Sequence, residues 1–194
     1  MGYSQADKAL SRERILEAAA RQISEHGLDS VSVADAMGSA GLTKGAFYAH
    51  FTSREAMIAE AAERVMQRGQ AHLDHFFQVK KKPTVAEIVD AWLNQRHIES
   101  LDGGCGVCAL AGEARYAGPE VREVIAGQFR KNVGQIAQAL GGDEAANARA
   151  TAILTAIVGA VSMARAVGNP ELARAILDNT RAMVSHPAFD KPGL

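Results

Sequence analysis

Apolar residues recur along this chain at spacings of three and four, the period of an amphipathic α-helix, and do not alternate as they do in a β-strand. Between residues 8 and 26, for example, Ile15, Leu16, Ala19 and Ile23 are spaced in this way, and Gly27 follows where a glycine commonly ends a helix. Similar segments continue to about residue 184. The pattern predicts an all-α protein of about nine helices.

Capping residues, glycines and prolines separate the predicted helices. Thr52 with Glu55, and Thr84 with Glu87, have the T-x-x-E spacing of a capping box, and Pro170 stands at a first helical position. Ser32, Thr43, Asp143 and Asn169 are further expected caps. The helices are expected at residues 8–26, 33–37, 44–51, 53–78, 85–100, 105–116, 121–140, 144–167 and 170–184.

Composition excludes several classes of protein. The chain has 194 residues, of which 47% are apolar, so it can bury a core and is not disordered. Two cysteines make no disulfide framework, no stretch of eighteen apolar residues predicts a membrane span, and the first fourteen residues are polar. We therefore expect a cytoplasmic protein. The net charge of −1 identifies no partner.

The segment "GLTKGAFYAHFTSREAM", residues 41–57, carries the most specific signal. A helix of seven or eight residues is not stable alone, and Phe47 and Phe51 share the face that would dock it on the helices before it. The other faces carry small side chains flanked by a cation and two polar rings: Lys44, Gly45, Ala46, Tyr48, Ala49 and His50. Two helices joined by "AGL", the second with such a surface, predict a helix-turn-helix that reads DNA.

Residues 13–61 resemble the N-terminal DNA-binding domain of the TetR/AcrR family of transcriptional regulators. The spacing of nine residues carries the resemblance: Gly27, Ser32, Val33, Gly41, Thr43, Lys44, Gly45, Tyr48 and Phe51. It implies a three-helix DNA-binding domain at residues 1–52, followed at residues 53–194 by a larger helical domain that binds a small-molecule effector and forms a homodimer. It also implies a regulator without catalytic activity, most often a repressor, with no cofactor and no metal.

The resemblance implies roles for eight residues of the small domain. Thr43, Lys44, Tyr48 and His50 match positions that touch phosphates or base edges, Gly45 and Ala46 match positions of close approach, Ser32 matches a cap that can meet a phosphate, and Arg54 stands at the start of the fourth helix. The sequence departs from the family at "DAM" and at Gly38, which weakens a short helix. Residues 1–55 hold six Lys or Arg and seven Asp or Glu, so affinity for operator DNA must come from placed contacts.

The larger domain gives weaker signals. Six residues are candidate walls of the effector pocket: Met66, Phe76, Trp92, Cys105, Tyr116 and Phe129. Five of these are spaced as core residues, and the interiors of helical bundles are also where apolar ligands bind. The resemblance implies that the Ala-rich helices at 144–167 and 170–184 pair across a two-fold axis, and reading a palindromic operator needs such symmetry. No membrane partner is expected.

Three alternatives stay open at this stage. Cys105 follows two glycines at a predicted helix start, where a thiolate is favoured, so the regulator could sense oxidants or electrophiles. The Cys105-Gly-Val-Cys108 motif could instead belong to a helical thiol–disulfide protein, or bind a metal with His97, although no strands and no second ligand pair support these readings. The third alternative is a helical interaction protein that never meets DNA.

Overall fold

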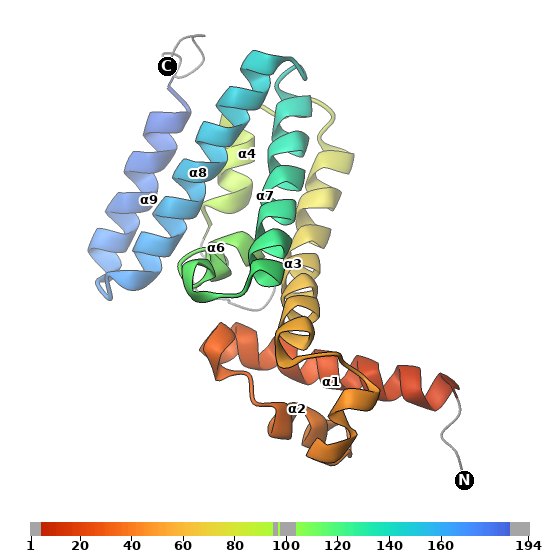
Figure 1. Ribbon diagram of the computed structural model, residues 1–194. Coiled ribbons are helices and arrows are strands. Elements are labelled where there is room, and N and C mark those ends of the chain that lie inside the picture. The colour runs from red at the N-terminus through yellow and green to blue at the C-terminus, as the bar shows by residue number, and fades with distance from the viewer. Residues whose placement is uncertain (1–4, 95–96, 98–103, 187–194) are drawn as a thin grey trace.

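The computed structural model describes residues 5–94, 97 and 104–186, and it confirms the helical prediction (Figure 1). No β-strand occurs among these residues. The small N-terminal part contains α1 (Gln5–His26), α2 (Val33–Ser39) and two 3-10 helices, η1 (Leu28–Ser30) and η2 (Lys44–Ala49). The larger part contains α3 (Arg54–Val79), α4 (Val85–Trp92), α6 (Gly106–Leu110), η3 (Ala114–Tyr116), α7 (Pro119–Ala139), α8 (Glu144–Ala166) and α9 (Pro170–Val184).

Helix α3 connects the two parts of the molecule. Its first half packs across α1 and its second half lies along α7, while α7, α8 and α9 stand side by side in the larger part (Figure 1). Three ion pairs tie α1 to α3, with N–O distances of 2.5–2.6 Å: Arg12–Glu60, Glu13–Arg64 and Glu17–Arg68. The arginines of these pairs are only partly exposed, so they fix the crossing of the two helices more firmly than freely solvated pairs would.

Most of the expected helix ends are confirmed. Gly27 ends α1 with φ at +87° and Gly168 ends α8 with φ at +58°, both in the left-handed region that favours glycine. Thr84 and Glu87 form both hydrogen bonds of a capping box. Three further caps accept a hydrogen bond from the backbone N–H three residues on: Ser32 from Asp35, Asp143 from Ala146 and Asn169 from Leu172.

Two expected boundaries in the small part are wrong. The cap of α3 is Ser53, whose Oγ accepts from the Ala56 N–H at 3.0 Å, and not Thr52. Ser53 is fully extended, with φ at −152° and ψ at 167°, which places its hydroxyl over the first turn. The helix expected at 44–51 is the 3-10 helix η2, which is tighter than an α-helix and has six residues, and its Thr43 cap makes no side-chain hydrogen bond to it.

Two expected helices of the larger part are shorter than the sequence pattern suggests. Helix α4 ends at Trp92 because Leu93 leaves the helical region, with ψ at 65°, and the remainder of the expected helix lies mostly outside the described residues. The helix expected at 105–116 is interrupted by a turn around Gly112, which leaves the five-residue α6 and the three-residue η3. Glycine weakens a helix, and the turn lets Glu113 face the small part of the molecule.

Helix α6 approaches α3 so closely that glycine is required on both sides of the contact. A Cβ atom on Gly69 of α3 would overlap the Gly104 carbonyl oxygen, and one on Gly106 of α6 would lie 2.5 Å from the Met66 sulfur. Both are closer than non-bonded atoms come. The absence of side chains at these two positions therefore allows α6 to pack against the backbone of the helix that enters the small domain.

Glu113 makes a direct contact between the two parts of the chain. Its Oε2 atom accepts a hydrogen bond from the Leu28 N–H at 2.6 Å, just past the end of α1. A Cβ atom on Gly27 would lie 2.6 Å from the same oxygen. The turn after α6 is thus fastened to the end of α1 by a charged hydrogen bond, which is stronger than a neutral one.

The glycine at this contact allows a stability test. We expect Gly27→Ala to lower the free energy of unfolding by about 1–2 kcal/mol, because the positive φ and the adjacent carboxylate both oppose a methyl group. The control is Gly38→Ala in α2, where a Cβ meets nothing within 4 Å and alanine should add about 0.5–1 kcal/mol. Urea denaturation followed by circular dichroism measures both. Equal stability of the two variants would contradict the Glu113 contact.

Candidate DNA-binding surface

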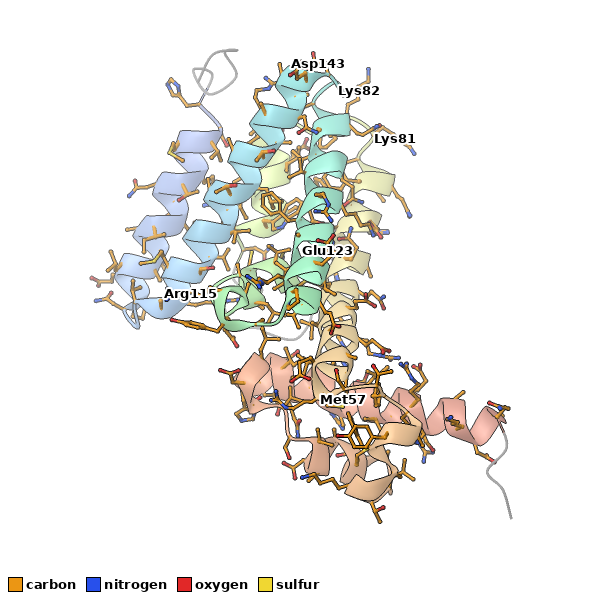
Figure 2. The ribbon with its side chains drawn as sticks, viewed as in Figure 1. Met57, Lys81, Lys82, Arg115, Glu123 and Asp143 are labelled. Carbon is orange, nitrogen blue, oxygen red and sulfur yellow. The ribbon has the colours of Figure 1, made fainter. Side chains whose placement is uncertain are left out.

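The helix-turn-helix is held by a compact apolar core. Phe47 and Phe51 are each 4% exposed and stack with ring centroids 5.6 Å apart. Met37 of α2 and Met57 of α3 are fully buried in the same core. Figure 2 shows Met57 at the N-terminal end of α3, where this helix meets the small domain. The two Phe side chains therefore anchor η2, as the sequence predicts, and are unavailable to a ligand.

The turn between α2 and η2 is fixed by one glycine. Gly41 has φ at +74°, and the Leu42 N–H donates to the Met37 carbonyl at 3.0 Å. This closes the end of α2 and sends the chain back across α1. Because the turn is short and internally hydrogen-bonded, the start of η2 has one orientation relative to α2.

The outer side of η2 presents Lys44, Gly45 and Tyr48 to solvent. The Tyr48 side chain is 80% exposed, although its ring edge contacts Phe47 at a centroid distance of 5.3 Å. Lys44, Gly45 and Thr43 are also exposed, and a Cβ atom on Gly45 would find only the Thr43 Oγ1, at 3.8 Å. A cation, a hydroxyl and a nearly bare backbone thus share one surface.

His50 and Arg54 are more constrained than the sequence alone indicates. The His50 carbonyl accepts from Arg12 Nε at 3.4 Å, and its ring is half-buried. Burial, with Lys8 and Arg12 nearby, lowers the pKa of His50 below its usual value, so the ring is neutral near pH 7. Arg54 donates to the Val31 carbonyl at 3.0 Å and braces the loop before α2.

The remaining predicted residues lie at the edges of this surface. Ser32 is half-buried as the cap of α2, and its backbone N–H donates to Gln22 Oε1 at 3.2 Å. Ala46 is half-buried against the core. Sequence reasoning missed Gln22 and Glu60, which together with Arg12 set the loop and the angle between α1 and α3. Their partners are ten to forty-eight residues away, so no local pattern reveals them.

The six candidate effector residues do not form one site. Met66, Trp92 and Cys105 are buried in the packed interior, and Phe76 is half-buried against Phe77. The expectation that Tyr116 is spaced as a core residue is wrong, because its ring is 72% exposed under the Arg115 guanidinium. Only Phe129 of the six lines the groove of about 410 Å³ between α6, α7 and α8.

The two cysteines are both free and both buried. A hydrogen bond from the Cys108 thiol and the N–H groups of Cys108 and Val107 stabilise a Cys105 thiolate, which lowers the pKa of Cys105 to about 6. The pKa of Cys108 is raised, because its proton holds that hydrogen bond and the site is desolvated. No cluster of three or more His, Cys, Asp or Glu side chains suited to a metal occurs in the part of the chain that the structure describes.

The helix-turn-helix segment is similar in sequence to known proteins. Residues 15–61 match the model of the bacterial regulatory proteins of the tetR family. A Bacillus subtilis (strain 168) HTH-type transcriptional regulator, YvdT, is 39% identical over 71 residues, a match that spans 34% of this chain and 37% of that relative.

Solved structures extend the likeness to the whole fold. The chain is similar to a TetR-family regulator from Cytophaga hutchinsonii, with a TM-score of 0.71, 18% identity and coverage of 94% of this chain and 96% of that one. It is similar to the reduced form of E. coli NemR, with a TM-score of 0.69, 19% identity and coverage of 90% and 94%. Fold and motif together define a helix-turn-helix protein with a helical second domain. The helix-turn-helix segment matches the tetR family model, and the overall fold is similar to that of TetR-family regulators.

Proposed function

We propose that this chain is a cytoplasmic, homodimeric transcriptional regulator that represses by binding a palindromic operator and is released by a small-molecule effector. The observation that carries the proposal is the exposed surface of Lys44, Gly45 and Tyr48 on η2, which the buried Phe47 and Phe51 hold rigidly. The DNA-binding domain would comprise residues 1–52 and the effector domain residues 53–194, with the first turns of α3 completing the core of the former.

The proposed contacts follow from the shape of the surface. The bare backbone at Gly45 and the short Ala46 allow η2 to enter the major groove, while Lys44 and the Tyr48 hydroxyl reach phosphates on one wall. Thr43, Ser32 and His50 lie at the other edges and would add phosphate or base contacts. Arg54 would contribute mainly by bracing the Val31 loop. We propose no enzymatic activity and no cofactor.

An exposed seam on α8 and α9 supports the homodimer. The outward side of α8 carries small or apolar residues spaced by three, four and seven: Ala145, Ala148, Ala152, Gly159, Met163 and Ala166. Leu172 and Met183 of α9 are about half exposed. Ile153 and Ile157, on the opposite side of α8, are buried in the subunit's own core and do not belong to the seam. A second copy packed on this seam would give the two-fold symmetry of a palindrome.

The apolar composition of α8 would also suit a membrane-spanning helix, but the core and the seam together account for it. With 23 residues and a mean hydropathy of 1.3 over its most apolar window, α8 is long and apolar enough to cross a membrane, and 39% of that window is buried. One such helix is common in the core of bundle proteins. Buried Ala150, Leu154 and Val161 on one side and the seam on the other explain its composition without a bilayer.

Release from the operator would be a shift in population. An effector bound in the larger domain would favour a separation of the dimer's two DNA-binding domains that no longer fits successive major grooves. Thermodynamic linkage then requires DNA to weaken effector binding by the same factor.

A thiol-sensing repressor is the second candidate, favoured by the hydrogen-bonded pair at Cys105 and Cys108. Oxidation of the Cys105 thiolate and the Cys108 thiol to a disulfide would release one proton and pass two electrons to a peroxide or quinone, which takes up two protons and becomes water or a hydroquinone. The pair lies where α6 packs on α3, so a change in its geometry would reach the helix that enters the DNA-binding domain.

Substitutions on η2 test the DNA surface. We expect Lys44→Ala to weaken operator binding by about 1 kcal/mol and to reduce the slope of log affinity against log salt by about one, because one phosphate contact is lost. Tyr48→Phe should weaken operator binding by about 1 kcal/mol, because one hydrogen bond to a phosphate is lost. Gly45→Leu should weaken it more than either, because the added side chain blocks the approach of η2 to the groove.

The matched control is Lys81→Ala, which removes the same charge at the far end of α3 (Figure 2). Gel-shift and fluorescence anisotropy, with operator sequences selected from a random DNA pool, give the affinities. A Lys44→Ala protein that binds as tightly as the parent, with the same salt slope, would show that η2 does not face the DNA.

The seam predicts the oligomeric state. Light scattering should give the parent about twice the 20.5 kDa chain mass. Gly159→Glu should shift it toward the monomer because a charge would be buried in the seam. Gly134→Glu in α7 is the control, since a Cβ at either glycine meets nothing within 4 Å of its own chain. A monomeric parent, or a Gly159→Glu dimer as stable as the parent, would refute the seam.

Alkylation kinetics test the thiol candidate. Cys105 should react faster than Cys108, with a rate that rises through about pH 6 and is level above pH 8, because the thiolate is the reactive form. Cys108→Ala should move this rise to higher pH by removing the stabilising hydrogen bond. Modification should release DNA from the parent, while Cys105→Ser should bind DNA and resist release. DNA retained after complete Cys105 modification would exclude the sensor.

A further inference from the structure

The groove between α6, α7 and α8 has the size and lining of a small-molecule site. Its volume of about 410 Å³ lies within the range of ligand pockets, roughly 300–1,000 Å³. Apolar side chains from all three helices form its walls: Val107, Ala111, Ile125, Phe129 and Val158. Such a lining favours an apolar or aromatic body.

The polar groups of the groove carry one sign of charge. Arg122 and Arg130, both exposed on α7, line it together with Thr155 of α8, and no carboxylate is among its lining residues. Arg130 also pairs with Glu123, which projects from α7 into solvent (Figure 2), and its planar guanidinium has further donors. Two arginine forks beside apolar walls match a carboxylate or sulfonate on an apolar body.

We propose that this groove binds a small organic anion with an apolar body, and that its occupancy is transmitted to the DNA-binding domain through Glu113. The proposal rests on the proposed function and names the chemical class of its effector. Ala111 and Ala114 line the groove on either side of Glu113, whose carboxylate accepts from the Leu28 N–H at 2.6 Å. A ligand that displaces this turn therefore moves or breaks the contact at the end of α1.

The contact at Glu113 is suited to transmit such a change. The Glu113 carboxylate lies so close to the Gly27 backbone that an added Cβ atom would come within 2.6 Å of its oxygen. On the other side, Gly106 and Gly69 let α6 and the residues before it pack directly on α3, so α6 has no room to move further toward α3. A small displacement in the groove is therefore directed to Leu28.

Two matched fluorescent probes test the binding site in the absence of DNA. The probes are 8-anilinonaphthalene-1-sulfonate and N-phenyl-1-naphthylamine, which have the same aromatic body with and without a negative charge. We expect the double variant Arg122→Gln/Arg130→Gln to bind the sulfonate about tenfold more weakly than the parent, because charged hydrogen bonds are lost, and to bind the neutral probe unchanged.

Two further variants locate the site. Ala126→Trp, which fills the groove, should abolish binding of both probes, whereas Arg115→Gln removes an exposed charge outside the lining and should change neither. If the double arginine variant binds the sulfonate like the parent, or loses both probes equally, the anion assignment is wrong. If the sulfonate converts the dimer to a monomer in light scattering, the groove is a subunit contact and the proposal fails.

Hydrogen exchange at Leu28 tests the transmission, again without DNA. Saturating sulfonate probe should accelerate exchange of the Leu28 amide at least severalfold in the parent. Glu113→Gln, which keeps an acceptor oxygen, should behave like the parent, and Glu113→Ala should exchange fast with and without probe while binding it normally. Unchanged Leu28 exchange on probe binding would overturn the transmission. Because no step requires operator DNA, a parent that fails to bind DNA would refute the regulator and leave the site standing.

Discussion

The close packing of α6 on α3 is the constraint that relates the larger part of the molecule to the helix-turn-helix. Two glycines, Gly69 and Gly106, remove the side chains that would otherwise separate the helices. Because α3 also carries Met57 and Ile58 into the core of the helix-turn-helix, the position of α6 and the position of η2 are set by the same rigid helix. Bulkier residues here would push α6 away from α3 and weaken this direct relation between the two ends of the molecule.

The turn after α6 gives this relation a second connection. Glu113 reaches the backbone at the end of α1, so the small domain is held both along α3 and at Leu28. One attachment would act as a hinge, whereas two attachments at different points define an orientation. The ion pairs between α1 and α3 add to this, and they involve three arginines that would otherwise be available to a polyanion.

Much of the architecture could be predicted from the sequence, because helices, caps and glycine stops are local features. Ser32, Thr84, Asp143 and Asn169 all cap as expected. The two failures have different causes. Ser53 replaced Thr52 because two adjacent hydroxyls offer the same chemistry one residue apart, whereas the helix expected at 105–116 is interrupted by a turn around Gly112 that brings Glu113 to Leu28, eighty-five residues away in sequence. The exposed strip of η2 follows from helical geometry, whereas the groove depends on how α6, α7 and α8 meet.

The burial of Trp92 has an optical consequence. It is the chain's one tryptophan, it is fully buried on α4, and its ring lies edge-on to Phe77 at a centroid distance of 6.3 Å. Intrinsic tryptophan emission therefore originates only in the larger domain, where an apolar environment shifts it to shorter wavelengths. The small domain has no tryptophan, so emission excited at a wavelength that only tryptophan absorbs reports on the larger domain alone, without an introduced label.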